Sequence, residues 1–384
     1  MTRPITIIGT GLAGYNLARE LRKQDPAVAL RIISADAGDF YSKPMLSNGL
    51  AGNKTAAQLA MKSATRMAEE LAAEILVDTR VSEIDPVGKT VVTSQGRYEY
   101  SQLVLALGAD PFKPAMTGDA VAEVQTINDL ADYAVFRERL AGKQKVVLLG
   151  GGLIGCEFAN DMAQLGLAVD VVELAAWPLS RHLPEPAGRY LQAALGQKGV
   201  RFHFNTTATS VVRSGEQYNV TLADGEALAA DLVVSAIGLH PRHALAQSAG
   251  LHIHRGIVVD AYLRTSNPDI YALGDCAEVE GHVLPFVMPI MQCARALAAT
   301  LVGNTMRVVY PAMPVVVKTP ACPTVVSPPA TGAEGDWQIE QDATGLKARF
   351  IGPDGALLGF ALLGSATAER QALTTQLPAI LPAA

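Results

Sequence analysis

Two glycine-rich turns are the parts of this sequence whose residue types and spacing most clearly predict chemistry. Each turn follows a short apolar run and opens a helical pattern. Glycines at these positions let the backbone approach a pyrophosphate, and the N-terminus of the following helix offers free N–H groups and a positive dipole end. Both turns have the pattern Gly-x-Gly-x-x-Gly, formed by Gly9, Gly11 and Gly14 in the first copy and by Gly150, Gly152 and Gly155 in the second. A chain with two such turns is expected to hold two dinucleotides.

An acidic residue near the end of the next strand would bind the ribose hydroxyls of each dinucleotide. Asp36 takes this place after the first turn, although it could also be a solvated aspartate of a loop. Glu173 takes it after the second turn, where a carboxylate repels a 2′-phosphate. Residues 174–177 supply no arginine for such a phosphate. The second turn is therefore predicted to bind NADH rather than NADPH.

The elements that must position these turns repeat along the chain. Strand, turn, helix and strand are predicted at 5–8, 9–14, 12–22 and 30–33, and again at 146–149, 150–155, 153–165 and 169–173. Such units build parallel sheets, so the predicted fold class is α/β with two Rossmann-like dinucleotide-binding domains. Further strands are predicted at 103–107, 232–237 and 271–273, and a further helix at 291–301.

The last part of the chain differs in composition. From residue 309 onward, prolines punctuate segments that are rich in valine. The valine content favours a small folded α+β domain, and a mobile linker is the alternative.

The overall composition excludes several classes of function. The 384 residues are 49% hydrophobic and 18% charged with a net charge of −6, which predicts a globular protein that binds neither nucleic acid nor a membrane surface. No apolar run could span a membrane and no secretory signal opens the chain, so we expect a cytoplasmic protein. The cysteines have neither metal-binding nor redox-pair spacing; they are Cys156, Cys276, Cys293 and Cys322.

Three further segments carry a family resemblance. Residues 265–275, which end in Gly274-Asp275, resemble the second flavin motif of the two-dinucleotide-binding flavoproteins, the FAD-dependent pyridine nucleotide oxidoreductases. Residues 103–108 and 236–238 resemble the strands at which that family crosses between its domains. The resemblance implies an interrupted FAD domain with an NAD domain inserted in it. The implied boundaries are 1–110 and 239–308 for the FAD domain, 111–238 for the NADH domain and 309–384 for the C-terminal domain.

The resemblance also implies which residues bind the two cofactors. Asp275 would accept a hydrogen bond from a ribitol hydroxyl, and the helix after residues 287–289 would direct its amides to the flavin pyrimidine, unless that segment is plain core. The implied FAD residues are Gly9, Gly11, Gly14, Asp36, Lys43, Pro44, Val81, Gly108, Asp275, Met288 and Lys318. The implied NAD residues are Gly150, Gly152, Gly155, Glu173 and Gly238.

Glu157 is the candidate catalytic acid. In the resembled family a glutamate at this place lies where nicotinamide meets flavin, usually paired with a lysine. The related ferredoxin reductases carry that lysine after a Pro-Leu-Ser run, where this sequence has Asn48. A buried glutamate without a cation would be costly or protonated. We expect Lys318 to supply the cation, with Lys43 as the second choice and an exposed Lys318 as the alternative.

The route by which electrons leave the flavin follows from what the sequence lacks. Disulfide reductases need a cysteine pair, and oxygen-reducing relatives need a cysteine in a Leu-Ser-Cys-Gly run, where Asn48 stands here. Cys276 follows the second flavin motif and could lie near the flavin, but a lone buried cysteine usually acts as a small apolar residue. Single electrons would then pass to a metalloprotein.

Two segments narrow the choice of metalloprotein. Residues 41–47 and 313–323 resemble the rubredoxin–NAD(+) reductases, which implies rubredoxin as a transient partner, in alkane hydroxylation or oxygen defence. Ferredoxin and flavorubredoxin reductases remain alternatives. An NADH-sensing flavoprotein without turnover is a further alternative, which the intact second turn disfavours.

Overall fold

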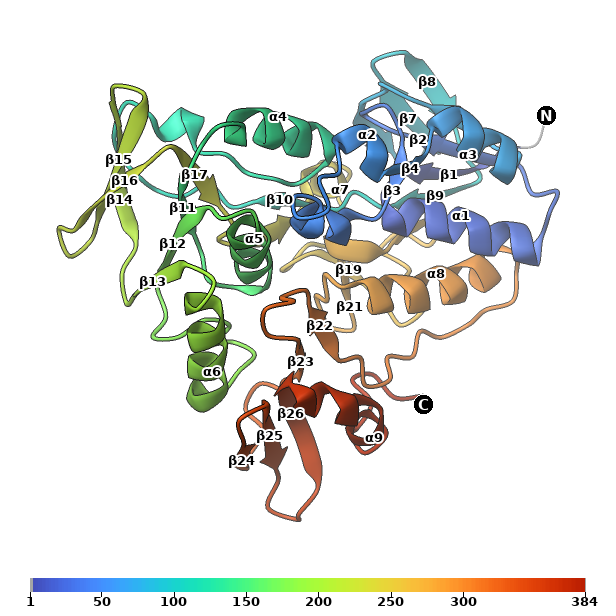
Figure 1. Ribbon diagram of the computed structural model, residues 1–384. Helices are drawn as coiled ribbons and strands as arrows, with labels where there is room; N and C mark the ends of the chain where they lie inside the picture. The colour runs from blue at the N-terminus through green and yellow to red at the C-terminus, as the bar shows by residue number, and fades with distance from the viewer. Residues whose placement is uncertain (1–2, 384) are drawn as a thin grey trace.

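The computed structural model describes residues 3–383, and a five-stranded parallel sheet forms its first dinucleotide fold (Figure 1). In sheet order the strands are β20 (Ile270–Ala272), β9 (Gln102–Leu105), β1 (Ile5–Ile8), β2 (Leu30–Ile33) and β5 (Glu74–Leu76). The helices α1 (Leu12–Gln24) and α8 (Val287–Leu301) pack against each other. Every residue of β1 is buried, as expected for a central strand that is covered on both faces.

A second parallel sheet repeats this arrangement. Its order is β13 (Val200–Phe204), β12 (Ala168–Glu173), β11 (Lys145–Leu149) and β17 (Leu232–Ser235). β11 lies between β12 and β17 as β1 lies between β2 and β9, and α5 (Leu153–Gln164) takes the place of α1. The predicted duplication of a dinucleotide fold is therefore confirmed.

Each fold also carries a three-stranded antiparallel sheet. In the first fold it consists of β6 (Val81–Asp85), β7 (Thr90–Thr93) and β8 (Gly96–Glu99). In the second it consists of β14 (Ala208–Ser214), β15 (Gln217–Leu222) and β16 (Ala227–Ala230).

A short antiparallel ribbon joins the two folds. It pairs β10 (Ala109–Pro111) with β18 (Leu239–Pro241) and so contains both places where the chain crosses from one fold to the other. The ribbon supports the boundaries near residues 110 and 239, which we keep as a proposal together with the boundary near 308.

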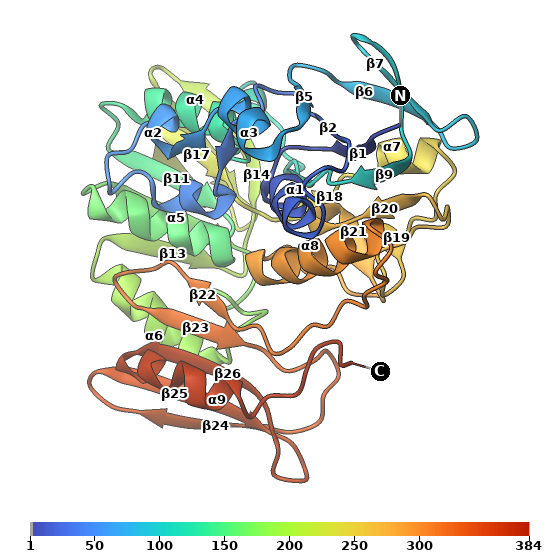
Figure 2. The same cartoon turned by 90° about the vertical axis from the view of Figure 1, so that its right-hand side faces the viewer.

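The last part of the chain is folded and is no linker. Its antiparallel sheet has the order β22 (Val315–Val317), β23 (Thr324–Ser327), β26 (Leu357–Gly364), β25 (Gly345–Ile351) and β24 (Asp336–Gln341). The short helices η4 (Ser365–Glu369) and α9 (Arg370–Thr374) complete the predicted α+β domain. Figures 1 and 2 show this domain in red below the two dinucleotide folds, with β22 beneath α5 and the start of α8.

The remaining elements connect or flank these layers. They are β3 (Phe40–Tyr41), η1 (Lys43–Asn48), α2 (Ala56–Leu59), β4 (Ala60–Lys62), α3 (Ala64–Leu71), η2 (Val121–Glu123), α4 (Leu130–Leu140), α6 (Glu185–Gly196), α7 (Ala244–Ser248), β19 (Ile257–Val259), η3 (Gly274–Cys276) and β21 (Ala277–Val279). α6 contacts β25 and β26, and α5 contacts η1. Within residues 3–383, no helix combines the length and apolar character that crossing a bilayer requires.

Some predicted boundaries were wrong. The helix expected at 291–301 begins one turn earlier, because Pro289 fits the first turn, where a backbone N–H has no partner within the helix. The strands expected at 103–107 and 232–237 end two residues early, at Leu105 and Ser235. Their last predicted residues form the turns through which the chain leaves each sheet.

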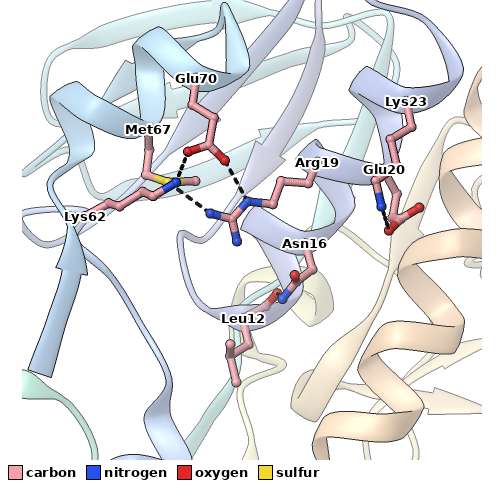
Figure 3. Close-up of polar contacts among 8 residues, drawn as sticks. All are labelled: Leu12, Asn16, Arg19, Glu20, Lys23, Lys62, Met67 and Glu70. Atoms are coloured by element: carbon pink, nitrogen blue, oxygen red, sulfur yellow. Dashed lines mark hydrogen bonds and ion pairs between the residues drawn. The ribbon is translucent and has the colours of Figure 1, made fainter.

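An ion network fastens α1 to its neighbours (Figure 3). The Glu70 carboxylate accepts hydrogen bonds from Arg19 Nε (3.0 Å) on α1 and from Lys62 Nζ on β4. The Arg19 guanidinium also lies over the Phe40 ring, 4.3 Å from its centroid. These contacts hold the helix whose N-terminus follows the first glycine turn.

Replacing Glu70 with glutamine should lower the free energy of unfolding by about 0.5–1 kcal/mol, since the network is partly exposed. The bonds from Lys62 and Arg19 lower the pKa of Glu70, so its contribution is present above its ordinary pKa and is lost as the pH falls through the lowered value. Urea unfolding near pH 7 and at about pH 3 measures this. The matched control is Glu69→Gln, an exposed residue that pairs with Arg66 on α3, the helix that also carries Glu70. A Glu70→Gln effect that persists in acid would contradict the assignment.

Candidate active site

The first glycine turn contains packing glycines and one open glycine. Gly9 has a φ of +119°, and a side chain there would overlap the carbonyl oxygen of Ala106, directly after the neighbouring strand β9. A Cβ on Gly14 would overlap the carbonyl oxygen of Gly9. A Cβ on Gly11, in contrast, would meet nothing within 4 Å. Gly11 also starts α1 without a side-chain cap, which leaves the first N–H groups free for a ligand.

The second turn has the same geometry. Gly150 has a φ of +100°, and its Cβ would lie 2.6 Å from the carbonyl oxygen of Ala236. A Cβ on Gly155 would overlap the carbonyl oxygen of Gly150, whereas one on Gly152 would meet nothing within 4 Å. In both turns the outer glycines allow helix and strand to pack, and the middle glycine keeps the ligand side clear.

The acidic residue after each turn is connected to that turn. Asp36 Oδ1 accepts hydrogen bonds from Ser34 Oγ (2.6 Å) and Gly38 N (2.8 Å), and Ser34 in turn bonds to Thr10 within the first turn (2.6 Å). Asp36 is exposed at the end of β2, and these bonds leave it acceptor capacity for a ribose.

Glu173 lies directly against the second turn. Its carboxylate accepts hydrogen bonds from the backbone N–H groups of Gly151 and of Ala175 (2.9 Å). The negative charge of Glu173 is therefore fixed directly beside the second glycine turn.

Lys43 and Asp275 are two half-buried residues of the first fold whose opposite charges interact. Lys43 Nζ donates to Asn128 Oδ1 (2.6 Å); burial lowers the pKa of Lys43, and the charge of Asp275 opposes this shift. Burial raises the pKa of Asp275, and Lys43 opposes that shift. No donor within residues 3–383 hydrogen-bonds to the Asp275 carboxylate. It is therefore a half-buried acceptor suited to a ligand hydroxyl.

Glu157 and Lys318 form an ion pair at the centre of the molecule. Glu157 is 3% exposed on α5, and its carboxylate binds Lys318 Nζ, the Lys318 backbone N–H (3.0 Å) and the Ser47 hydroxyl. The structure thus pairs Glu157 with Lys318, whereas Lys43 is bonded to Asn128. The loss of the lysine at Asn48 is offset by a lysine from the C-terminal part of the chain.

The same face of α5 binds two more loop segments. Asn160 Oδ1 accepts the N–H of Ala321 (3.0 Å), three residues beyond Lys318. Asp161 accepts the N–H groups of Leu50 (2.9 Å) and Ala51 (3.1 Å), just beyond η1. One buried polar face of α5 therefore holds η1 and the 318–321 loop in place.

Comparison with known protein families agrees with this geometry. The model of the pyridine nucleotide-disulphide oxidoreductases matches residues 3–300, and that of the rubredoxin binding C-terminal domain matches residues 307–377. The chain belongs to the pyridine nucleotide-disulphide oxidoreductase family. The family match and the two sheets confirm the predicted fold class.

Curated relatives of this oxidoreductase span its whole length. Rubredoxin-NAD(+) reductase of Alcanivorax borkumensis is 50% identical over 99% of this chain and 100% of its own. Rubredoxin-NAD(+) reductase of Acinetobacter baylyi is 46% identical over 99% of both chains. Nitric oxide reductase FlRd-NAD(+) reductase of Aeromonas salmonicida is 40% identical over 98% of this chain and 97% of its own.

Solved structures of the family have the same fold. The ferredoxin reductase of the CYP199A2 system from Rhodopseudomonas palustris is 28% identical, with a TM-score of 0.88 over 98% of this chain and 96% of that chain. Putidaredoxin reductase in its covalent complex with putidaredoxin is 26% identical, with a TM-score of 0.88 over 98% and 94%.

The family's cofactors, FAD and a pyridine nucleotide, agree with the two predicted cofactors. The residues of the first fold fit FAD on structural grounds. Gly11 and Gly108 leave open space where a Cβ would stand, and Lys43 has N–H groups beyond the one that Asn128 binds. Asp275 is a half-buried acceptor to which no group of residues 3–383 donates.

The structure places the remaining predicted residues in the first fold and beside the ribbon that joins the folds. Pro44 is in the first turn of η1, directly after Lys43. Val81 is half-buried at the start of β6, and Met288 is exposed in the first turn of α8. Gly238 adjoins the ribbon that joins the folds, where its Cβ would lie 3.6 Å from the Phe112 ring.

The cysteines of this oxidoreductase are structural. All four are free and buried. The Cys276 thiol faces the carbonyl oxygens of Leu105 and Leu273 (3.4 Å each), and burial raises its pKa to about 11. The alternative of a redox-active Cys276 is disfavoured, because a thiolate would be costly there.

Sequence reasoning missed several residues of the site. Ser47 of η1 binds Glu157 of α5, and Asp161 of α5 binds the backbone just beyond η1. Asn128 binds Lys43, which lies 85 positions away in the sequence. Asn128 precedes Asp129, the N-cap of α4, so its sequence neighbours indicate only the start of a helix. Only the fold brings these side chains together.

We expect Gly152→Ala and Gly155→Ala to fail in different ways. The first should leave folding intact and raise the KM for NADH at least about ten-fold, because a methyl group enters the ligand side. The second should destabilise the protein by about 1–3 kcal/mol, because helix and strand must move apart. Thermal unfolding and steady-state kinetics with ferricyanide measure both effects. The reverse pattern would contradict the geometry of the turn.

Proposed function

We propose that this protein passes electrons from NADH through FAD, one at a time, to rubredoxin. The observation that carries the proposal is the position of Lys318. It lies within the segment that matches the rubredoxin binding domain, yet its ammonium binds Glu157 on the helix of the second glycine turn. The 50% identity to the Alcanivorax borkumensis rubredoxin-NAD(+) reductase over the full chain supports the same activity.

Residues of the first fold would hold FAD, which when bound accepts the electron pair of NADH and releases electrons singly. The free N–H groups at the start of α1 would bind its diphosphate, with Gly11 leaving room. Asp275 would accept a ribitol hydroxyl, and Asp36 would bind the adenosine ribose. Met288 stands in the first turn of α8, whose amides would face the flavin pyrimidine.

Residues of the second fold would hold NADH. The start of α5 offers free N–H groups next to Gly152, and Glu173 would bind the ribose 2′-hydroxyl. Glu157 lies one turn further along α5, so the nicotinamide end would reach the Glu157–Lys318 pair. We assign Glu157 and Lys318 as catalytic residues. The ammonium pairs with the buried carboxylate, and together they would exclude water and orient the nicotinamide.

A flavorubredoxin reductase is the second candidate. Relatives named nitric oxide reductase FlRd-NAD(+) reductase are 40% identical over nearly the whole chain, against 50% and 46% for the rubredoxin-NAD(+) reductases. The higher identities favour rubredoxin. Ferredoxin is the weaker choice, since the ferredoxin reductase neighbour is 28% identical. A protein that only senses NADH would not require the C-terminal segment that matches the rubredoxin binding domain.

We further propose that the protein works in the cytoplasm, where NADH is generated. There it would supply reduced rubredoxin for alkane hydroxylation or oxygen defence. The acidic composition and the fold offer no argument for a nucleic acid as partner.

The test is to reduce the purified protein with NADH without oxygen, add oxidised rubredoxin, and follow the loss of rubredoxin colour. We expect fast, saturable bleaching with NADH, and bleaching at least about ten-fold slower with NADPH, because Glu173 repels the 2′-phosphate. A ferredoxin and a flavorubredoxin are tested in parallel. Flavin reduction without bleaching of rubredoxin would overturn the proposed partner, and absence of flavin reduction would overturn the whole proposal.

A further inference from the structure

Asn128 occupies a buried position between the two dinucleotide folds. The residue is 6% exposed, and its side chain accepts one hydrogen bond and donates another. Oδ1 accepts from Lys43 Nζ (2.6 Å), and Nδ2 donates to the carbonyl oxygen of Ala109 (3.1 Å) on the connecting ribbon. The backbone N–H of Asn128 is held by Asp132 Oδ2 (2.8 Å). The amide is thus fixed with its oxygen toward the Lys43 ammonium.

The Lys43 ammonium lies among several charges. Asp275, Asp129 and Asp110 favour its charged form, whereas burial and the nearby Arg242 disfavour it. Arg242 is itself held by Asp110, with Nη2 2.6 Å from Oδ1. Within residues 3–383, Asn128 Oδ1 is the hydrogen-bond acceptor of Lys43, so the other ammonium N–H groups can face a bound cofactor.

We propose that Asn128 is a positioning residue that fixes the Lys43 ammonium beside Asp275 and thereby raises the reduction potential of the bound flavin. A flavin gains negative charge when it is reduced, and a fixed cation stabilises that charge. A mobile lysine would turn toward solvent or toward one of the neighbouring carboxylates. The inference rests on the proposed function, because it requires FAD at the face formed by Lys43 and Asp275.

Asn128 could support the connecting ribbon or position Lys43, and the two roles have different consequences. If Asn128 only supported the ribbon through Ala109, its removal would act without regard to Lys43. If it positions Lys43, its removal has no effect once Lys43 is gone. A double-mutant cycle distinguishes the two roles.

The experiment compares the FAD-loaded Asn128→Leu, Lys43→Met and double variants by the midpoint potential of the flavin and the rate of its reduction by NADH. Asn128→Leu should lower the potential and slow the reduction about ten-fold, as expected for a lost hydrogen bond to a charged group. In the Lys43→Met background it should change neither quantity. Equal effects in both backgrounds would overturn the proposal, as would an unchanged potential in Asn128→Leu alone. Asn219→Leu, at an exposed position of β15, is the matched control.

A second measurement does not depend on turnover. Brief acetylation followed by mass spectrometry reports how often the Lys43 amine is neutral. Asn128→Leu should speed the labelling of Lys43 and Asn128→Asp should slow it, since a carboxylate acceptor favours the ammonium. Equal labelling in both variants would overturn the proposal. The wild-type protein separates failure of this proposal from failure of the proposed function. If NADH does not reduce the flavin of the wild type, the proposed function is refuted. The labelling rates of Lys43 still test the positioning by Asn128 in that case.

Discussion

The Glu157–Lys318 ion pair is the interaction on which the arrangement of the three parts depends. A buried carboxylate is strongly unfavourable unless a cation and hydrogen-bond donors surround it. Glu157 is 3% exposed, and both its cation and one of its N–H donors come from Lys318. The cation belongs to the C-terminal domain, and therefore that domain must lie against α5 for the carboxylate to be buried at all. The Ser47 hydroxyl adds a contact from the first fold, so all three parts meet at one carboxylate.

This constraint gives α5 two roles. Its N-terminus begins at the second glycine turn, and its buried face binds η1 and the 318–321 loop through Glu157, Asn160 and Asp161. The nucleotide face and the acceptor domain are thereby joined by one rigid helix. We infer that the acceptor domain does more than bind a partner, because it completes the site at which NADH would react. If Asn48 were the lysine that the resemblance to the ferredoxin reductases implies, the C-terminal domain would not have this role.

Local patterns predicted much of the fold and the binding faces. The spacing of the glycines fixed both turns, and the structure shows why, since Gly14 and Gly155 pack backbone against backbone. The pairing of Glu157 with Lys318 was expected from the family resemblance, which implies a glutamate with a lysine partner at this place, together with the cost of leaving a buried carboxylate without a cation. Asn128 could not be found in this way, because its partner is 85 positions away and its own neighbours only indicate a helix start. The early start of α8 was missed, although Pro289 is compatible with the first turn of a helix.

The central claim is that Glu157 and Lys318 act as one unit, and a double-mutant cycle on the rate of flavin reduction by NADH tests it most directly. The variants are Glu157→Gln, Lys318→Met and their combination, each measured by stopped flow after its fold and FAD content have been verified. The account predicts that each single variant slows reduction about ten-fold or more, and that the double variant is little slower than either. Independent, multiplying effects, or an unchanged rate in Lys318→Met, would contradict it.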